Sequence, residues 1–147
     1  MTIMLFADAR SRESALRDDY LAATAEELKK ARSSQRLAAI ANQRVLFPHS
    51  GSIELTAEAL TLGEWKTLQP RDVVHVAQEF IPEYNRFAAG GARGGFPSLG
   101  ALKRTGAPLI VDLRTGERIV LLVGFEVLSG VTKNSSWVKP LQKFAAA

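Results

Sequence analysis

After Gln43 the chain is a series of short β-type segments separated by turn residues, and this pattern constrains the fold more than any other feature. Residues 52–56 alternate Ile53 and Leu55 with polar neighbours, and residues 60–62 repeat the alternation after a short connection. Alternation with a period of two packs one face of a strand on a core and leaves the other in water. The two segments therefore predict a hairpin within an antiparallel meander.

Further strands are expected on both sides of this hairpin. Residues 45–47 form a short apolar segment before Pro48, and residues 72–80 follow a turn, with Val74 and Val76 expected on one face. Residues 108–113 alternate inward-facing leucine and valine, and Thr115 and Gly116 provide a tight turn into residues 118–125. Together these segments predict a mainly β domain.

The chain then ends in a predicted amphipathic helix. Asn134, Ser135 and Ser136 are residue types that cap helix N-termini. The apolar side chains that follow have the i, i+4, i+7 spacing of one helical face, namely Trp137, Leu141 and Phe144. Pro140 is expected in the first turn, where its missing amide proton is tolerated, or as the first helical residue itself. This helix is predicted to close the β-domain.

Residues 8–43 lack Gly and Pro and are rich in good helix formers, so they predict a helical N-terminal arm. Glu13 with Arg17 and Glu26 with Lys30 have the spacing of helical ion pairs. One face collects Leu16, Tyr20, Ala23, Leu28 and Ala31. We expect this face to pack on the β-domain or a second copy of the chain, a partner or membrane-surface helix being the alternative. The predicted division is residues 1–43 as the arm and residues 44–147 as a domain that folds without it.

Four strings, in this order, carry a resemblance: GSIELTAEALTLGEW, LQPRDVVHV, APLIVDLRTGERIVLLV and NSSWVKPLQKF. Over about residues 45–144 the pattern resembles the pleckstrin-homology-like (PH-like) superfold of small bacterial proteins. The resemblance implies an α+β, mainly β fold: a bent antiparallel barrel or sandwich of about seven strands capped by a C-terminal helix. Members of the superfold bind phosphoinositides at the open end, or bind peptides and proteins. Phosphoinositide binders place basic residues across the first hairpin, whereas here that turn has Glu58 and no Arg or Lys.

The sequence offers few residues that could catalyse a reaction or bind a metal. There is no Cys, so disulfides, thiolate metal sites and a cysteine nucleophile are excluded. His49 and His75 lack the i+2 or i+4 partners of a metal site, and no nucleophile, base and acid combination is legible from spacing. We therefore expect no catalytic residues, no metal and no cofactor, and a binding protein instead of an enzyme.

The charge and the apolar segments bear on location. A net charge of +4 permits only weak general attraction to phosphates or anionic membranes. The most apolar run, residues 119–123, is far below the ~20 residues that a spanning helix requires, and no signal peptide is legible. A cytoplasmic location is expected.

The long Gly-rich segment at residues 82–106 is the predicted binding loop, because loops of this length are usually functional or disordered. Its run from Gly90 to Gly95 lacks the Lys and Ser or Thr of a phosphate-binding loop. Basic and aromatic side chains alternate in it: Tyr84, Arg86, Phe87, Arg93, Phe96, Lys103 and Arg104. The sequence thus favours a noncatalytic adaptor that holds a protein partner through this loop or the N-terminal helix. The alternative is an anionic ligand, a lipid headgroup or a nucleic acid, bound by the loop's basic residues.

Overall fold

The protein is described by a computed structural model that covers residues 15–30, 46–81, 107–126 and 131–147. Within these residues seven strands form one sheet in the order β4-β3-β2-β1-β7-β6-β5, with antiparallel neighbours throughout. The strands are β1 (Leu16–Thr24), β2 (His49–Leu55), β3 (Leu60–Leu62), β4 (Lys66–Leu68), β5 (Val73–Gln78), β6 (Leu109–Leu113) and β7 (Arg118–Val123). The helices are α2 (Ala25–Lys29), a 3-10 turn η2 (Pro70–Asp72) and α5 (Asn134–Ala146). The mainly β, antiparallel prediction with a C-terminal helix is confirmed.

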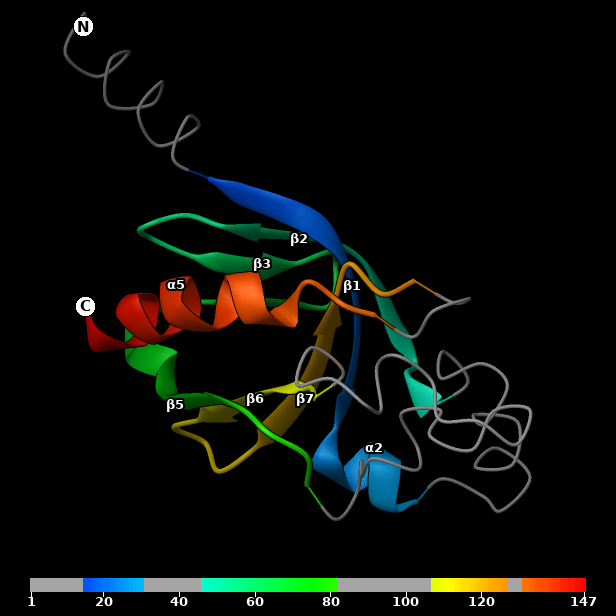
Figure 1. Cartoon of the computed structure of the whole chain (residues 1–147). Helices are drawn as coiled ribbons and strands as arrows, with labels where there is room; N and C mark the ends of the chain where they lie inside the picture. The colour runs from blue at the N-terminus through cyan, green and yellow to red at the C-terminus, as the bar shows by residue number, and fades with distance from the viewer. Residues whose placement is uncertain (1–14, 31–45, 82–106, 127–130) are drawn as a thin grey trace, which may run out of the picture.

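The sheet curls into a half-barrel, and α5 lies on its concave side between β3 and β5 (Figure 1). The inner face forms one apolar cluster that contains Trp137, Leu141 and Phe144 together with side chains from every strand. The outer face of β1, β6 and β7 is covered as well, because a second cluster includes Leu28 of α2 and Phe47. The middle of the sheet is therefore buried on both sides, and α5 closes the half-barrel as predicted.

The predicted N-terminal helix is wrong for residues 16–24, which form β1. This strand pairs with β2 on one edge and β7 on the other, so it lies in the middle of the sheet. Its side chains alternate between the two clusters, Tyr20 and Ala22 inward and Leu21 and Ala23 outward. The expected helical face does not exist over these residues, and the predicted boundary at residue 43 would cut through the sheet.

Two residues of the expected helical ion pairs have partners that the sequence did not predict, Glu54 for Arg17 and Lys29 for Glu26, while Glu13 lies outside the described residues. Arg17 pairs across the sheet with Glu54 at 2.8 Å, since the two residues are opposite one another in the β1–β2 register. The short α2 begins after Thr24, whose side chain accepts from the amide of Glu27 while the Glu27 carboxylate accepts from the amide of Thr24. This capping box ends β1 and turns the chain into the helix.

Three local predictions also differ from the structure. Leu46 and Phe47 are not in a strand, although both are buried against the outer face. Val74 and Val76 do not share a face, because an irregularity in the pairing of β5 between Val73 and His75 breaks the alternation. Pro140 lies well inside α5 instead of in its first turn, since the helix already begins at Asn134.

The two hairpins predicted from alternation are confirmed. Strands β2 and β3 pair Ile53 with Leu62, and strands β6 and β7 pair around the turn at Thr115 and Gly116. Gly116 has a φ of +95°, a conformation that other residues rarely adopt.

In the described part of the chain no helix is long and apolar enough to cross a membrane.

Candidate functional site

The predicted binding loop falls outside the described residues. All seven side chains proposed for it, Tyr84, Arg86, Phe87, Arg93, Phe96, Lys103 and Arg104, lie in the range 82–106. Their role stays a prediction. The described elements form other candidate surfaces, at the ends of the half-barrel and along α5.

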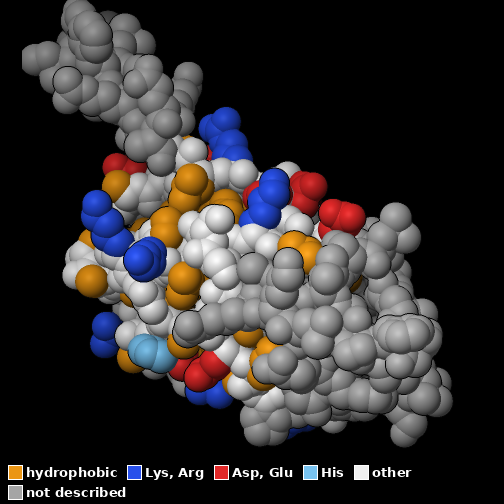
Figure 2. Space-filling model, in the orientation of Figure 1, with side chains coloured by type: hydrophobic (Ala, Val, Ile, Leu, Met, Phe, Trp, Pro, Cys, Tyr) orange, Lys and Arg blue, Asp and Glu red, His pale blue; other side chains and the backbone are white. Residues whose placement is uncertain are grey.

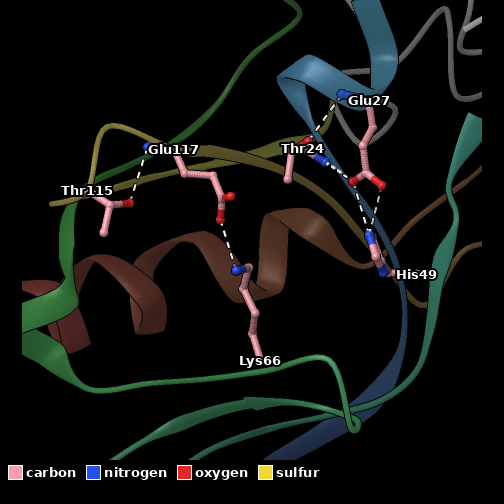
Figure 3. Close-up of polar contacts among 6 residues, drawn as sticks. All are labelled: Thr24, Glu27, His49, Lys66, Thr115 and Glu117. Carbon is pink, nitrogen blue, oxygen red and sulfur yellow. Dashed lines mark hydrogen bonds and ion pairs between the residues drawn. The ribbon is translucent and has the colours of Figure 1, made fainter. Parts of the chain in front are cut away.

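One end of the half-barrel is lined by polar side chains from four segments (Figure 3). His49, at the start of β2, lies with its Nε2 atom 3.0 Å from each carboxylate oxygen of Glu27. The same carboxylate accepts from the amide of Thr24 at 2.9 Å, so α2 is tied to both β1 and β2. Both histidine and glutamate are partly buried. The Glu27–His49 pair thus fixes α2 over this end of the barrel.

Aromatic and ionic contacts continue across the opening. The ring of His49 stacks on Trp65, with centroids 3.8 Å apart and planes within 10° of parallel. Lys66 places its Nζ atom 5.1 Å from the Trp65 ring centroid and 3.0 Å from the Glu117 carboxylate in the β6–β7 turn. Because Lys66 belongs to the edge strand β4, this ion pair links two distant parts of the curled sheet.

This end is therefore closed by its own side chains. A ligand there would have to separate the Glu27–His49 and Lys66–Glu117 pairs. A neighbouring hollow of about 300 Å³ is lined by Lys29 and Arg118 but also by two acids, Glu26 and Glu117. Its charges balance, which gives it no preference for an anion. Among the described residues no group of three or more His, Cys, Asp or Glu could hold a metal ion.

A different kind of surface lies between the edge strand β5 and α5. A hollow of about 240 Å³ is lined by Val74, His75, Val76, Gln142, Ala145 and Ala146. Val74 is 59% exposed, which is high for a large apolar side chain, and among the described residues it shares this status with Leu16 alone. The pairing irregularity at Val73 and His75 explains its position, because it turns Val74 away from the core.

The backbone of β5 also faces this groove, which we call the β5–α5 groove. The carbonyl of Val76 accepts a hydrogen bond at 3.0 Å from Nε2 of Gln142, in place of a neighbouring strand. Nearby, Ser135 donates to the Gln78 side chain at 3.1 Å. An edge strand presents unpaired backbone groups, and the side chain of Gln142 satisfies one of them here.

Helix α5 and the neighbouring strand β6 carry charges of opposite sign. Helix α5 has no Asp or Glu, and Lys139 and Lys143 form no ion pair within the described residues. His75 lies 3.7 Å from Asp112 on the neighbouring strand and remains exposed. Figure 2 shows Lys and Arg side chains beside hydrophobic ones over α5. The groove thus combines an exposed apolar side chain with a strand edge.

Sequence reasoning missed this groove. It placed Val74 on the same face as Val76 by simple alternation, and an irregularity in pairing leaves no clear mark in the sequence. The sequence contains one weak sign of the groove: Gln142 is a polar residue one helical turn after Val138, a side chain that packs against the core.

No protein-family model matches the chain, and neither the curated proteins nor the solved structures provide a match.

Proposed function

We propose that this protein is a noncatalytic PH-like adaptor that binds an extended segment of a partner protein in the β5–α5 groove. The observation that carries the proposal is the hydrogen bond from Gln142 to the Val76 carbonyl beside the exposed Val74. The strand order and the helix that closes the half-barrel support the PH-like part. The resemblance itself implies peptide or protein ligands for many members.

The proposed recognition is strand addition. A peptide laid along β5 would donate a backbone N–H to Val76 in place of the Gln142 amide, and its main chain would continue the sheet. Alternate side chains would then point toward Val74 and the small Ala145 and Ala146 of α5. An apolar side chain fits there.

The test is selection of binders from a displayed library of unstructured peptides, followed by mapping of the binding surface from amide chemical shifts. We expect shifts in β5 and α5. Val74→Lys should weaken binding at least about tenfold, because it places a charge where an apolar contact forms. Thr67→Lys is the matched control, since it puts the same side chain on an exposed position of β4, the opposite edge strand. Equal loss in both variants, or shifts confined to other elements, would contradict the proposal.

The alternative is an anionic ligand, bound by the basic residues of range 82–106, which include four bases against the single acid Glu83. Phosphate binding weakens steeply with salt, whereas strand addition with an apolar anchor does not. Titrating a short single-stranded oligonucleotide and anionic vesicles at two salt concentrations distinguishes the two. Tight, salt-sensitive binding to either probe, unaffected by Val74→Lys, would favour the loop.

A further inference from the structure

Another cavity lies on the other side of α5, where the start of β1 and the turn after β2 meet the end of the helix. Its volume is about 280 Å³. It is lined by Leu16, Leu55, Thr56, Ala57, Pro140, Lys143, Phe144 and Ala147. None of these residues lines the β5–α5 groove. The cavity is therefore a separate feature of the molecule.

The lining is apolar with one cation. Leu55 and Phe144 are buried parts of the inner core cluster, whereas Leu16 is 38% exposed and leaves the cavity open to the surface. The hydroxyl of Thr56 already serves the turn, because it accepts from the amides of Glu58 and Ala59. Lys143 is then the polar group that a ligand can use. It forms no ion pair within the described residues.

The size restricts the ligand. A protein cavity of about 150 Å³ accommodates benzene, and pockets for drug-sized molecules begin at about 300 Å³. This cavity lies near the lower end of that range, which suits an unbranched chain of roughly eight to ten carbons. The aliphatic and aromatic lining favours a hydrocarbon chain, and Lys143 favours an anionic end.

We infer that the cavity between β1, β2 and the end of α5 binds a monomeric medium-chain carboxylic acid, with its chain against Leu55 and Phe144 and its carboxylate beside Lys143. The chain would bury apolar surface that the ligand and the cavity otherwise expose to water. The carboxylate would stay at the rim, where water solvates it and Lys143 pairs with it. Complete burial of the charge is thereby avoided.

Two electrostatic effects act on the head group of a bound ligand, and they favour opposite charges. Lys143 favours an anion, whereas the free carbonyl groups in the last turn of α5 favour a cation. A full charge on a flexible side chain can reach the head group directly, so we expect the lysine to dominate. Isothermal titration calorimetry with decanoate, decanol and decylammonium, each below its micelle concentration, measures the order of their affinities. We expect decanoate to bind more tightly than decanol, and decylammonium to bind most weakly.

Two pairs of variants test the site. Ala57→Phe fills the cavity from an exposed turn and should abolish decanoate binding, while Glu58→Phe, at the next position of the turn but outside the lining, should leave it unchanged. Lys143→Gln should weaken decanoate binding roughly fivefold and leave decanol unaffected, as expected for a partly solvated ion pair. Lys139→Gln, one turn earlier on α5, is its control. Amide spectra establish that each variant is folded.

Several results would overturn the inference. They are tighter binding of decylammonium than of decanoate, decanoate binding that survives Ala57→Phe, or equal losses in the two lysine variants. Flotation with vesicles of neutral and anionic lipid separates the free acid from a membrane source. Binding to vesicles without binding to monomeric decanoate would also overturn it. Peptide binding in the β5–α5 groove does not depend on any of these outcomes.

Discussion

Asn134, at the start of α5, holds the last residue of β7, Val123, through its side chain. The Val123 amide donates to Oδ1 of Asn134 at 2.7 Å, and Nδ2 of Asn134 donates to the carbonyl of Ala107 at 2.9 Å. Asn134 is completely buried. One side chain thus satisfies two buried backbone groups and fixes the point at which the helix turns back onto the sheet.

Replacement of Asn134 tests this role. Asn134→Leu keeps the branched shape of the side chain but leaves the Val123 amide without a partner, and the Ala107 carbonyl keeps only a 3.4 Å bond from Gln78. The free energy of unfolding should therefore fall by about 2 to 4 kcal/mol. Urea denaturation measures the change. Ser136→Ala, at an exposed position of the same turn, should lie within about 0.5 kcal/mol of the original protein. A leucine variant as stable as the alanine control would refute the bridging role.

Trp137 tests the closure of the half-barrel by α5. It is 4% exposed and belongs to the inner core cluster together with Leu141 and Phe144. Trp137→Ala should cost about 3 to 5 kcal/mol of stability, the range for deleting a large buried aromatic side chain. Thermal unfolding followed by far-UV circular dichroism measures it, with Lys139→Ala as the control on the exposed face. A melting temperature within a degree or two of the original protein would show that α5 is not part of the core.

The buried Tyr20 makes the stability of the fold decrease at alkaline pH. Burial raises the pKa of the Tyr20 phenol above its ordinary value of 10.0, because the charged phenolate is disfavoured in the core. The folded state therefore holds this proton more tightly than the unfolded chain. The resulting stability is fully present below about pH 10 and is lost as pH rises through and above that value.

Tyr20→Phe measures this contribution. The variant loses the hydrogen bond from the phenol to the carbonyl of Leu62, which is 2.9 Å long, so it should be about 1 to 2 kcal/mol less stable at neutral pH. Its stability should fall less steeply than that of the original protein above pH 10. Urea denaturation at pH 7 and at several alkaline pH values tests both expectations. Parallel pH profiles for the two proteins would contradict them.

Periodicity predicted the elements that bury one face. The β2–β3 hairpin alternates in sequence as it does in the sheet, and Trp137, Leu141 and Phe144 share the buried face of α5. Each has a polar side that marks the period, and this makes strand and helix distinguishable from the sequence alone.

Strand β1 lacked such a mark. Residues 20–23, Tyr-Leu-Ala-Ala, are buried on alternate sides by two clusters, so the run reads as continuously apolar. A short run of this kind cannot be assigned to a strand or a helix by period, and its leucine and alanines favour a helix. Pairing with β2 and β7 overrides that preference. The β5–α5 groove was missed for a related reason, since an irregular pairing in β5 turned Val74 outward.

The central place of β1 reverses one expectation drawn from the sequence, namely that residues 44–147 fold without the preceding segment. Deleting residues 1–43 removes the strand that joins β2 to β7, so both would present unpaired edges, and the Tyr20 and Leu21 sides of the two core clusters would be lost. Unpaired edges and open apolar faces destabilise a small sheet. The fragment should therefore show a poorly dispersed amide spectrum and no cooperative unfolding transition.

The missing strand can also be supplied separately. A synthetic peptide of residues 15–30 contains β1 and α2, and mixing it with the fragment should restore amide dispersion in a saturable way, because the peptide provides both sets of pairing partners. The same peptide with proline in place of Ala22 should fail, since proline cannot donate to a sheet and Ala22 lies opposite His49 and Leu121. A fragment that folds cooperatively with no peptide present would show that β1 is dispensable, and would return the domain boundary to residue 43.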